Sequence, residues 1–243
     1  MSLSGVIGYL VARLYRLERQ AVGTYTVASL LSNNGPTLGG FLCLLYLGDE
    51  ALELSQIYTL FAVPYFFTVI FLVARNFAPG RKRGLVEVLR ANFQDPISVL
   101  PNSAMVIGLL LSIFRVPYPA FLDLPRTILV FAAVILYSTS FGLGMHVRSM
   151  VASLGRYLGM LPVKFLVAPA AGIGLGLLFG YSPATDPLAF KTLIIQASMP
   201  VAIWSVVACK IFALDDNLAV GLWVFTTVSV AALLPVFEWV TRL

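Results

Sequence analysis

The chain has 243 residues, of which 59% are hydrophobic and only 11% are charged, and its mean hydropathy is +0.92. This composition excludes an ordinary soluble globular domain and predicts an all-α integral membrane protein. The formal charge of +5 does not indicate nucleic-acid binding, because the basic residues lie in short segments between apolar runs. A single histidine, and two cysteines within apolar runs, predict neither a metal site nor a cofactor.

Eight apolar runs follow one another along the chain, and each is read as a membrane-spanning helix. The first run is short for a bilayer and begins almost at Met1, so we expect a helix whose start is barely included. The predicted spans are 3–15, 22–47, 54–74, 99–114, 126–147, 160–180, 189–212 and 217–240.

Basic residues set the predicted orientation of these spans. If the spans alternate in direction, most of the 16 Lys and Arg residues fall on one side, which the positive-inside rule makes cytoplasmic. Both termini then lie outside a plasma or bacterial inner membrane. Segment 84–93, on the cytoplasmic side, fits either an interfacial helix or a solvated linker. The cytoplasmic set is Arg13, Arg16, Arg19, Arg75, Arg81, Lys82, Arg83, Arg90, Arg148, Arg156, Lys164 and Lys210.

Two spans contain residues that interrupt helices. Residues 32–36 read Ser-Asn-Asn-Gly-Pro within the second span, and 196–200 read Gln-Ala-Ser-Met-Pro within the seventh. Proline removes a backbone donor and glycine adopts unusual dihedrals, so both spans should be discontinuous near the membrane midplane. Freed backbone groups there commonly bind a substrate or ion, although Pro and Gly can also merely kink a packed helix. The predicted substrate-binding residues are Asn33, Asn34, Gly35, Pro36, Gly39, Gln196, Ser198 and Pro200.

An internal repeat relates the two interrupted spans. Residues 43–50 and 209–216 share a cysteine, an aliphatic residue, an aromatic residue and an acidic pair, at an offset of 209 − 43 = 166. At this offset the second span falls on the seventh and the third on the eighth, in opposite directions, which indicates an inverted repeat. We therefore divide the single membrane domain, 1–243, into a shortened first repeat (1–75), a cytoplasmic linker (76–98) and a second five-helix repeat (99–243).

Two stretches of the chain resemble a known family. Residues 28–65, with the motif Gly48-Asp49-Glu50, are similar to the fourth and fifth helices of auxin efflux carrier family permeases. Residues 196–235, with Leu234-Pro235, resemble the ninth and tenth. The resemblance implies ten helices in two inverted repeats, as in bile-acid symporters, with substrate bound where two broken helices cross.

The resemblance also implies particular substrate-binding residues, and the chain departs from the family's pattern in two places. By position it implies Asn34 and Gly39 on one broken helix, and Gln196 and Pro200 on the other, as the substrate site. The family's proline seven residues after the motif asparagine is Phe41 here. The first span corresponds to the family's third, so either the start is truncated or the chain completes its scaffold by forming a homodimer.

The resemblance implies a secondary carrier, not an enzyme, that moves a small organic anion such as a dicarboxylate or an auxin-like acid by alternating access. The coupling ion, H⁺ or Na⁺, stays open. No carboxylate lies in mid-span, and Asp49, Asp215 and Glu238 are read as solvated caps at span ends. A lone histidine, His146, supplies no catalytic base for a nucleophile. Two alternatives remain: a sodium-coupled bile-acid-type symporter, and a membrane sensor or fragment that does not transport.

Overall fold

A computed structural model describes residues 1–35, 37–58, 62–80, 85–117, 119–122 and 153–242, together with single positions between 124 and 139. In these residues the chain is helical and has no β-strand, which confirms the all-α prediction for this part of the chain. Pro36, His146 and most of the predicted span 126–147 lie outside the described residues.

Three helices of the described part are long and apolar enough to cross a membrane: Asp49–Phe77, Leu154–Leu178 and Asp216–Thr241. Each contains a locally irregular turn. The first comprises α4 (Asp49–Tyr58), α5 (Ala62–Tyr65), the π-helical turn η1 (Phe66–Ile70) and α6 (Phe71–Phe77). The second comprises α11 (Leu154–Leu158), α12 (Met160–Pro162), the π-helical turn η3 (Val163–Val167) and α13 (Ala168–Leu178). The third comprises α16 (Asp216–Ser229), the 3₁₀ turn η4 (Val230–Leu233) and α17 (Leu234–Thr241).

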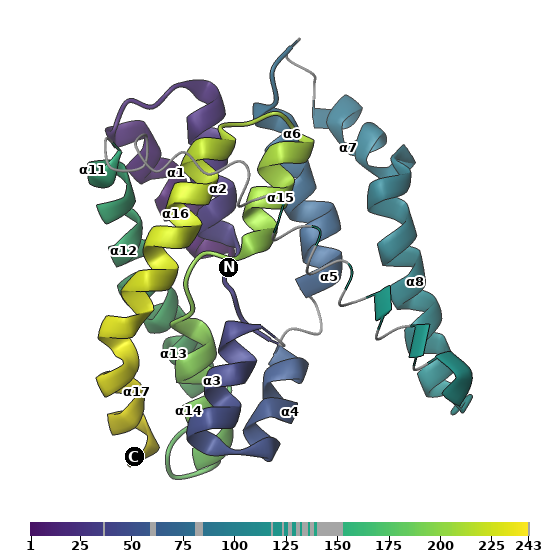
Figure 1. Ribbon diagram of the computed structural model, residues 1–243, viewed down its shortest axis with the longest axis vertical. Coiled ribbons are helices and arrows are strands. Elements are labelled where there is room, and N and C mark those ends of the chain that lie inside the picture. The colour runs from purple at the N-terminus through teal and green to yellow at the C-terminus, as the bar shows by residue number, and fades with distance from the viewer. Residues whose placement is uncertain are drawn as a thin grey trace.

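The predicted second span is two separate helices. Helix α2 (Arg19–Leu30) ends where Leu31 becomes extended, and α3 (Leu38–Leu47) begins after Thr37. Gly35 between them has a φ of +68°, a value that glycine adopts without steric cost. In Figure 1, α2 lies in the upper half of the molecule and α3 in the lower half.

The predicted seventh span is also two helices, and they run the opposite way. Helix α14 (Pro187–Ala197) rises from the lower half to the centre, and α15 (Ile203–Ile211) continues into the upper half (Figure 1). The interruption coincides with Pro200, which cannot donate a backbone hydrogen bond and disfavours helical dihedrals in Met199 before it.

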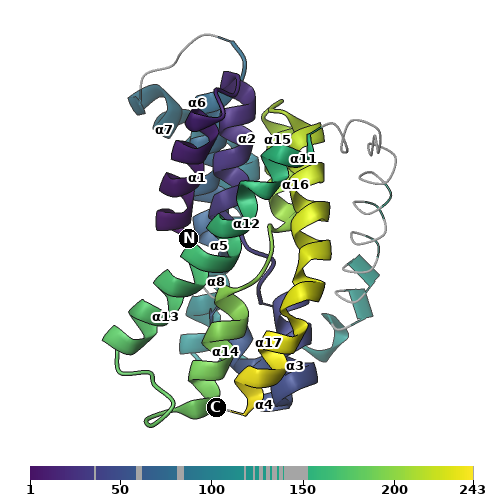
Figure 2. The same ribbon diagram turned by 90° about the vertical axis from the view of Figure 1, so that its left-hand side faces the viewer.

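Helix α2 is the central element of the upper half. Every residue from Ala21 to Leu30 is buried, which is the pattern of a helix surrounded on all sides. Helix α1 (Ser2–Leu14) packs closely against it, since Gly5 and Gly8 bring the two backbones together. A Cβ at Gly8 would lie 1.9 Å from Ser29 Oγ, so no larger residue fits there. Figure 2 shows that α1 begins at mid-height, level with the interruptions.

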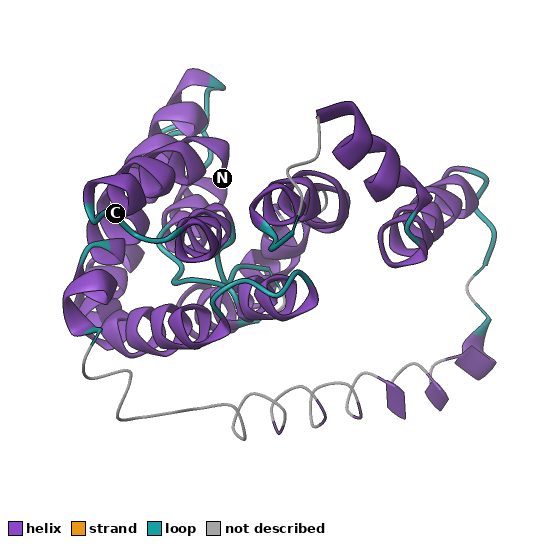
Figure 3. Ribbon diagram, turned by 90° about the horizontal axis from the view of Figure 1, so that it is seen from above, coloured by secondary structure: helices purple, strands orange, loops and turns teal. Residues whose placement is uncertain are grey.

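Segment 76–98 contains a helix, which overlaps the residues 84–93 read as an interfacial helix or a solvated linker. Helix α7 (Leu85–Gln94) precedes α8 (Pro96–Ile113), and the two stand to one side of the bundle in the view from above (Figure 3). Arg75 forms an ion pair with Asp95, and its guanidinium lies 5.2 Å from the centre of the Phe212 ring. This side chain therefore ties the α7–α8 junction to the end of α15. A short 3₁₀ turn, η2 (Ala120–Leu122), follows α8.

Candidate functional site

The two interruptions contact one another directly at the centre of the molecule. Ser32 and Val201 form an isolated antiparallel bridge. The Asn33 amide donates to the Pro200 carbonyl at 2.8 Å, and the Ala202 amide donates to the Leu31 carbonyl at 3.2 Å. Backbone groups that left their helices are thus paired with one another, as buried polar groups require. We call residues 31–37 the first break and residues 198–202 the second break.

The side chain of Gln196 joins the end of α14 to the first break. It is fully buried, its Oε1 accepts from the Gly35 amide at 2.8 Å, and its Nε2 donates to Cys43 Sγ at 3.2 Å. A Cβ at Gly39 would lie 2.7 Å from Gln196 Oε1. Glycine is therefore required at position 39 by the close approach of the amide rather than by its own dihedrals.

Thr226 of α16 holds the second break. Its Oγ1 accepts from the Val201 amide at 3.1 Å and donates within its own helix to the Leu222 carbonyl at 2.8 Å. Because Thr226 is fully buried, no water replaces it as the partner of Val201. The long helix Asp216–Thr241 thereby fixes the position of the break.

We expect Thr226→Val to lower the free energy of unfolding by about 1–3 kcal/mol, because it leaves the Val201 amide without an acceptor while keeping the side-chain shape. Thr227→Val is the matched control. In the described part of the chain the buried Oγ1 of Thr227 has no hydrogen-bond partner, so its loss should be neutral or stabilising. Thermal melting of the purified protein measures both, and equal melting temperatures would contradict this role of Thr226.

Lys164 holds the first break. It lies in η3, is fully buried, and donates from Nζ to the Ser29 carbonyl at 3.0 Å, the Leu31 carbonyl at 2.6 Å and Ser32 Oγ at 3.1 Å. The alternation of the spans predicts that Lys164 is one of the cytoplasmic charges, whereas the structure buries it beside the first break. The missed signal was its isolation, since no other charged residue occurs between Arg156 and Asp186. An ionisable residue within such an apolar run is usually functional.

A cavity of about 350 Å³ lies beside the first break. Its size falls within the range of small-molecule sites, which are about 300–1,000 Å³. Asn33 and Asn34 line it, and in the part of the chain that the structure describes their side-chain amides form no hydrogen bond. The polar lining residues are Ser32, Asn33, Asn34, Thr37 and Gln56, and the apolar ones are Met1, Leu31, Ala62, Val63, Phe66, Phe67, Ala202 and Trp204.

The predicted site residues fall into three groups. Asn33 and Asn34 line the cavity. Gly35, Gly39, Gln196 and Pro200 lie behind it and shape the breaks through the contacts above. The hydroxyl of Ser198 donates at 2.8 Å to the Ile194 carbonyl of its own helix and does not line the cavity. The sequence did not single out Lys164, Thr226 or Gln56.

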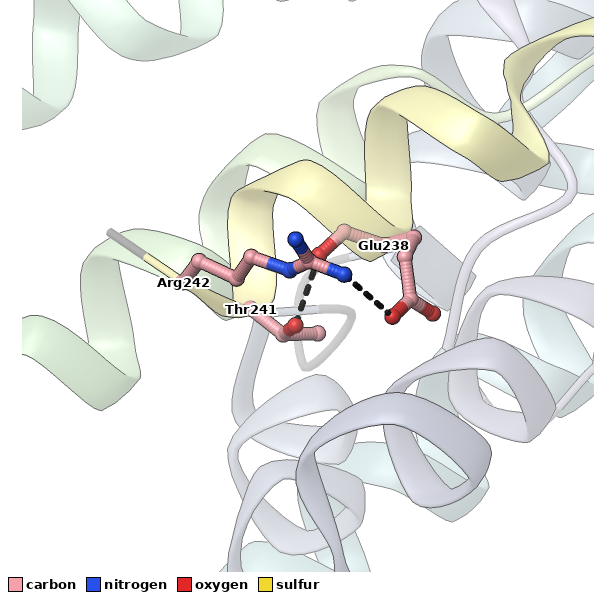
Figure 4. A network of polar contacts seen from close by, with 3 residues as sticks. All are labelled: Glu238, Thr241 and Arg242. Atoms are coloured by element: carbon pink, nitrogen blue, oxygen red, sulfur yellow. Dashed lines mark hydrogen bonds and ion pairs between the residues drawn. The ribbon is translucent and has the colours of Figure 1, made fainter.

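The acidic residues at the ends of the long helices lie elsewhere. Asp215 caps α16 by accepting from the Leu218 amide at 2.9 Å, and Asp49 is in the first turn of α4. At the C-terminal end of α17, the exposed side chains of Glu238 and Arg242 form an ion pair at 3.3 Å, and the Thr241 hydroxyl donates to the Glu238 carbonyl (Figure 4). Among the described residues, no three His, Cys, Asp or Glu side chains gather as a metal site.

The groups around the cavity suit an anion. Helices α3 and α15 both begin at the breaks, and a helix N-terminus carries a partial positive charge. The amides of Asn33 and Asn34 and the hydroxyl of Ser32 can donate hydrogen bonds, and the Lys164 ammonium lies behind Ser32. Comparison with known proteins finds no protein-family model and no curated protein that matches the chain.

Proposed function

We propose that the chain is an integral membrane carrier that moves a small organic anion by alternating access at the crossing of two broken helices. The observation that carries this proposal is the hydrogen-bonded contact between the two breaks beside a cavity lined by Asn33 and Asn34, whose side-chain amides form no hydrogen bond with the described residues. Broken helices that cross near the bilayer midplane are the usual substrate and ion sites of secondary transporters. A dicarboxylate or an auxin-like acid is the expected substrate class.

The distribution of apolar surface supports insertion into a bilayer. The most apolar 18-residue windows of Leu154–Leu178 and Asp216–Thr241 are only 17% and 33% buried, although their mean hydropathies are 1.8 and 2.0. Helix α2 has 12 residues and α3 has 10, about 18 Å and 15 Å of helix at 1.5 Å per residue. Their sum is close to the roughly 30 Å of a hydrocarbon core. Each pair of half-helices therefore amounts to one crossing.

The orientation that we propose rests on the basic residues at one end. Arg13 and Arg75 lie in the last turns of α1 and α6, and Arg19 begins α2. These three helix ends share the upper end in Figure 1. We assign that end to the cytoplasm by the positive-inside rule. The C-terminal end of α17, at the opposite end of the molecule, then faces outside.

The bounds of the helices support an inverted repeat. Adding the offset of 166 to α2 gives 185–196, close to α14 (Pro187–Ala197), and adding it to α3 gives 204–213, close to α15 (Ile203–Ile211). The long helix Asp49–Phe77 maps onto 215–243, which contains Asp216–Thr241. Because the two members of each pair run in opposite directions in Figure 1, the relation is the one expected of auxin-efflux-carrier-type permeases.

The proposed function is tested by flux in reconstituted vesicles. Radiolabelled malate, malonate and indole-acetate are offered with a proton gradient, a sodium gradient or neither. We expect flux of at least one anion, and at least a tenfold loss in the double variant Asn33→Ala and Asn34→Ala. A hydrogen bond to a charged group contributes about 1.5–3 kcal/mol, and removing these amides breaks no hydrogen bond within the described part of the protein.

The matched control is the double variant Asn76→Ala and Asn217→Ala, whose side chains are exposed at the ends of α6 and α16. Control flux should equal that of the wild type. If the Asn33 and Asn34 double variant has the same flux as the wild type, the cavity is not the site of transport. Flux that requires sodium would favour the bile-acid-type symporter, and a folded wild-type protein that moves none of the anions would favour the sensor.

A further inference from the structure

Lys164 is a buried cation with no counter-charge among its partners. Its three hydrogen-bond acceptors are two backbone carbonyls and one hydroxyl, and an ammonium group has three N–H bonds to donate. The ion pairs among the described residues, Arg75 with Asp95 and Arg242 with Glu238, do not include it. Among the described residues, the positive charge is therefore balanced only by the dipoles of the two carbonyls and the hydroxyl.

The position of Lys164 connects it to the cavity. Two of its three partners, Leu31 and Ser32, line the cavity, although Lys164 itself does not. Ser32 Oγ accepts from the ammonium, so the Ser32 hydroxyl proton remains free to donate on the cavity side. The neighbouring residues Asn33 and Asn34 line the same cavity. The Lys164 ammonium is therefore connected to the cavity through the hydroxyl of Ser32.

The π-helical turn explains how a lysine of the long helix reaches this place. The side chain leaves η3 and reaches the C-terminal end of α2, where it donates to the carbonyls of Ser29, in the last turn, and of Leu31, the extended residue that follows the helix. The C-terminal end of a helix is partially negative and would repel an anion. The full positive charge of the ammonium exceeds the partial negative charge of this helix end, which is about half an elementary charge. π-Helical turns of this kind frequently occur at functional sites.

We propose that Lys164 is the fixed positive charge of the anion site and acts on the ligand through Ser32, so that the site takes a carboxylate in preference to an uncharged molecule of the same shape. This inference rests on the proposed anion transport and names its positioning residue. A cation at roughly 6 Å, the sum of two hydrogen-bond lengths, strengthens the binding of an anion about tenfold to a hundredfold in a protein interior.

Ligand-induced thermal stabilisation of the purified protein tests this without requiring transport, because a ligand that binds the folded state raises its melting temperature. The probes are malonate and indole-acetate, each paired with its uncharged amide, malonamide or indole-acetamide. The wild type should be stabilised by a carboxylate. Lys164→Met should bind the carboxylate about tenfold to a hundredfold more weakly and the amide as well as the wild type does. Lys191→Met is the control, since that lysine also donates to a carbonyl, that of Thr241, far from the cavity.

The binding of the probes to Lys164→Met decides whether Lys164 supplies the positive charge of the site. A folded Lys164→Met protein that binds carboxylates like the wild type, or that loses carboxylate and amide equally, overturns it, as does a wild type that binds none of the probes. If Lys164→Met does not fold, Ser32→Ala takes its place, and a selective loss of carboxylate binding is again required. Selective binding without vesicle flux would leave the anion site standing and remove only the proposed transport.

Discussion

Gly40→Ala should unfold about 10 °C below the wild type and lose nearly all anion flux. A Cβ at this position would lie 2.2 Å from the carbonyl oxygen of Gly35 and 3.1 Å from Ser55 Oγ. The first of these contacts is with backbone, so rotating a side chain cannot relieve it. Overpacking of this kind costs about 1–3 kcal/mol and occasionally more, and 1 kcal/mol corresponds to about 2–4 °C in a chain of this size.

The effect of Gly40→Ala on function follows from the same contact. Moving the Gly35 carbonyl outward also moves the Gly35 amide, which donates to Gln196. The matched control is Gly174→Ala in α13, where an added Cβ would have no atom within 4 Å. This control should be as stable as the wild type or slightly more so, because alanine is the better helix former. A Gly40→Ala protein that melts and transports like the control would show that the backbone of the first break can take another conformation without loss of stability or flux.

The interruptions of the two helices could be predicted from sequence because their causes are local. Helix α2 ends at Leu30, just before the Ser-Asn-Asn-Gly-Pro segment, and α14 ends at Ala197, close to Pro200. Pro and Gly act on their own dihedrals and hydrogen bonds, whatever surrounds them. Apolar residues flank both breaks, in contrast, so hydropathy averaged over the length of a span gives two unbroken spans.

The partners of the breaks could not be predicted, because they come from distant parts of the chain. Lys164 contacts Leu31, which is 133 residues away in the sequence. Thr226, in α16, contacts Val201, which is 25 residues away. Alternation of the predicted spans places Lys164 with the cytoplasmic charges. Only its position in three dimensions reveals that the C-terminal end of α2 is the partner of this charge. Similarly, Cys43 fitted a repeat motif, but its acceptor role toward Gln196 depends on the crossing.

Gln196→Leu should reduce anion flux at least tenfold and lower the free energy of unfolding by about 1–3 kcal/mol. Leucine fills a similar volume but cannot accept from Gly35 or donate to Cys43. The Gly35 amide is then a buried donor without an acceptor, and such a donor loses its full solvation energy. The same change frees the first break to shift, and Asn33 and Asn34 move with it. Vesicle flux and thermal melting measure the two effects separately.

Gln94→Leu is the control for Gln196→Leu, because Gln94 is exposed at the end of α7, and neither measurement should change. The relation between flux and stability in Gln196→Leu then tests the role of the crossing. In an alternating-access carrier the two breaks must hold the same relative position each time the site forms, since hydrogen bonds from the amides depend on angle and distance. Reduced stability with wild-type flux would mean that the amides find the anion without Gln196, and would contradict a site built by the contact between the two breaks.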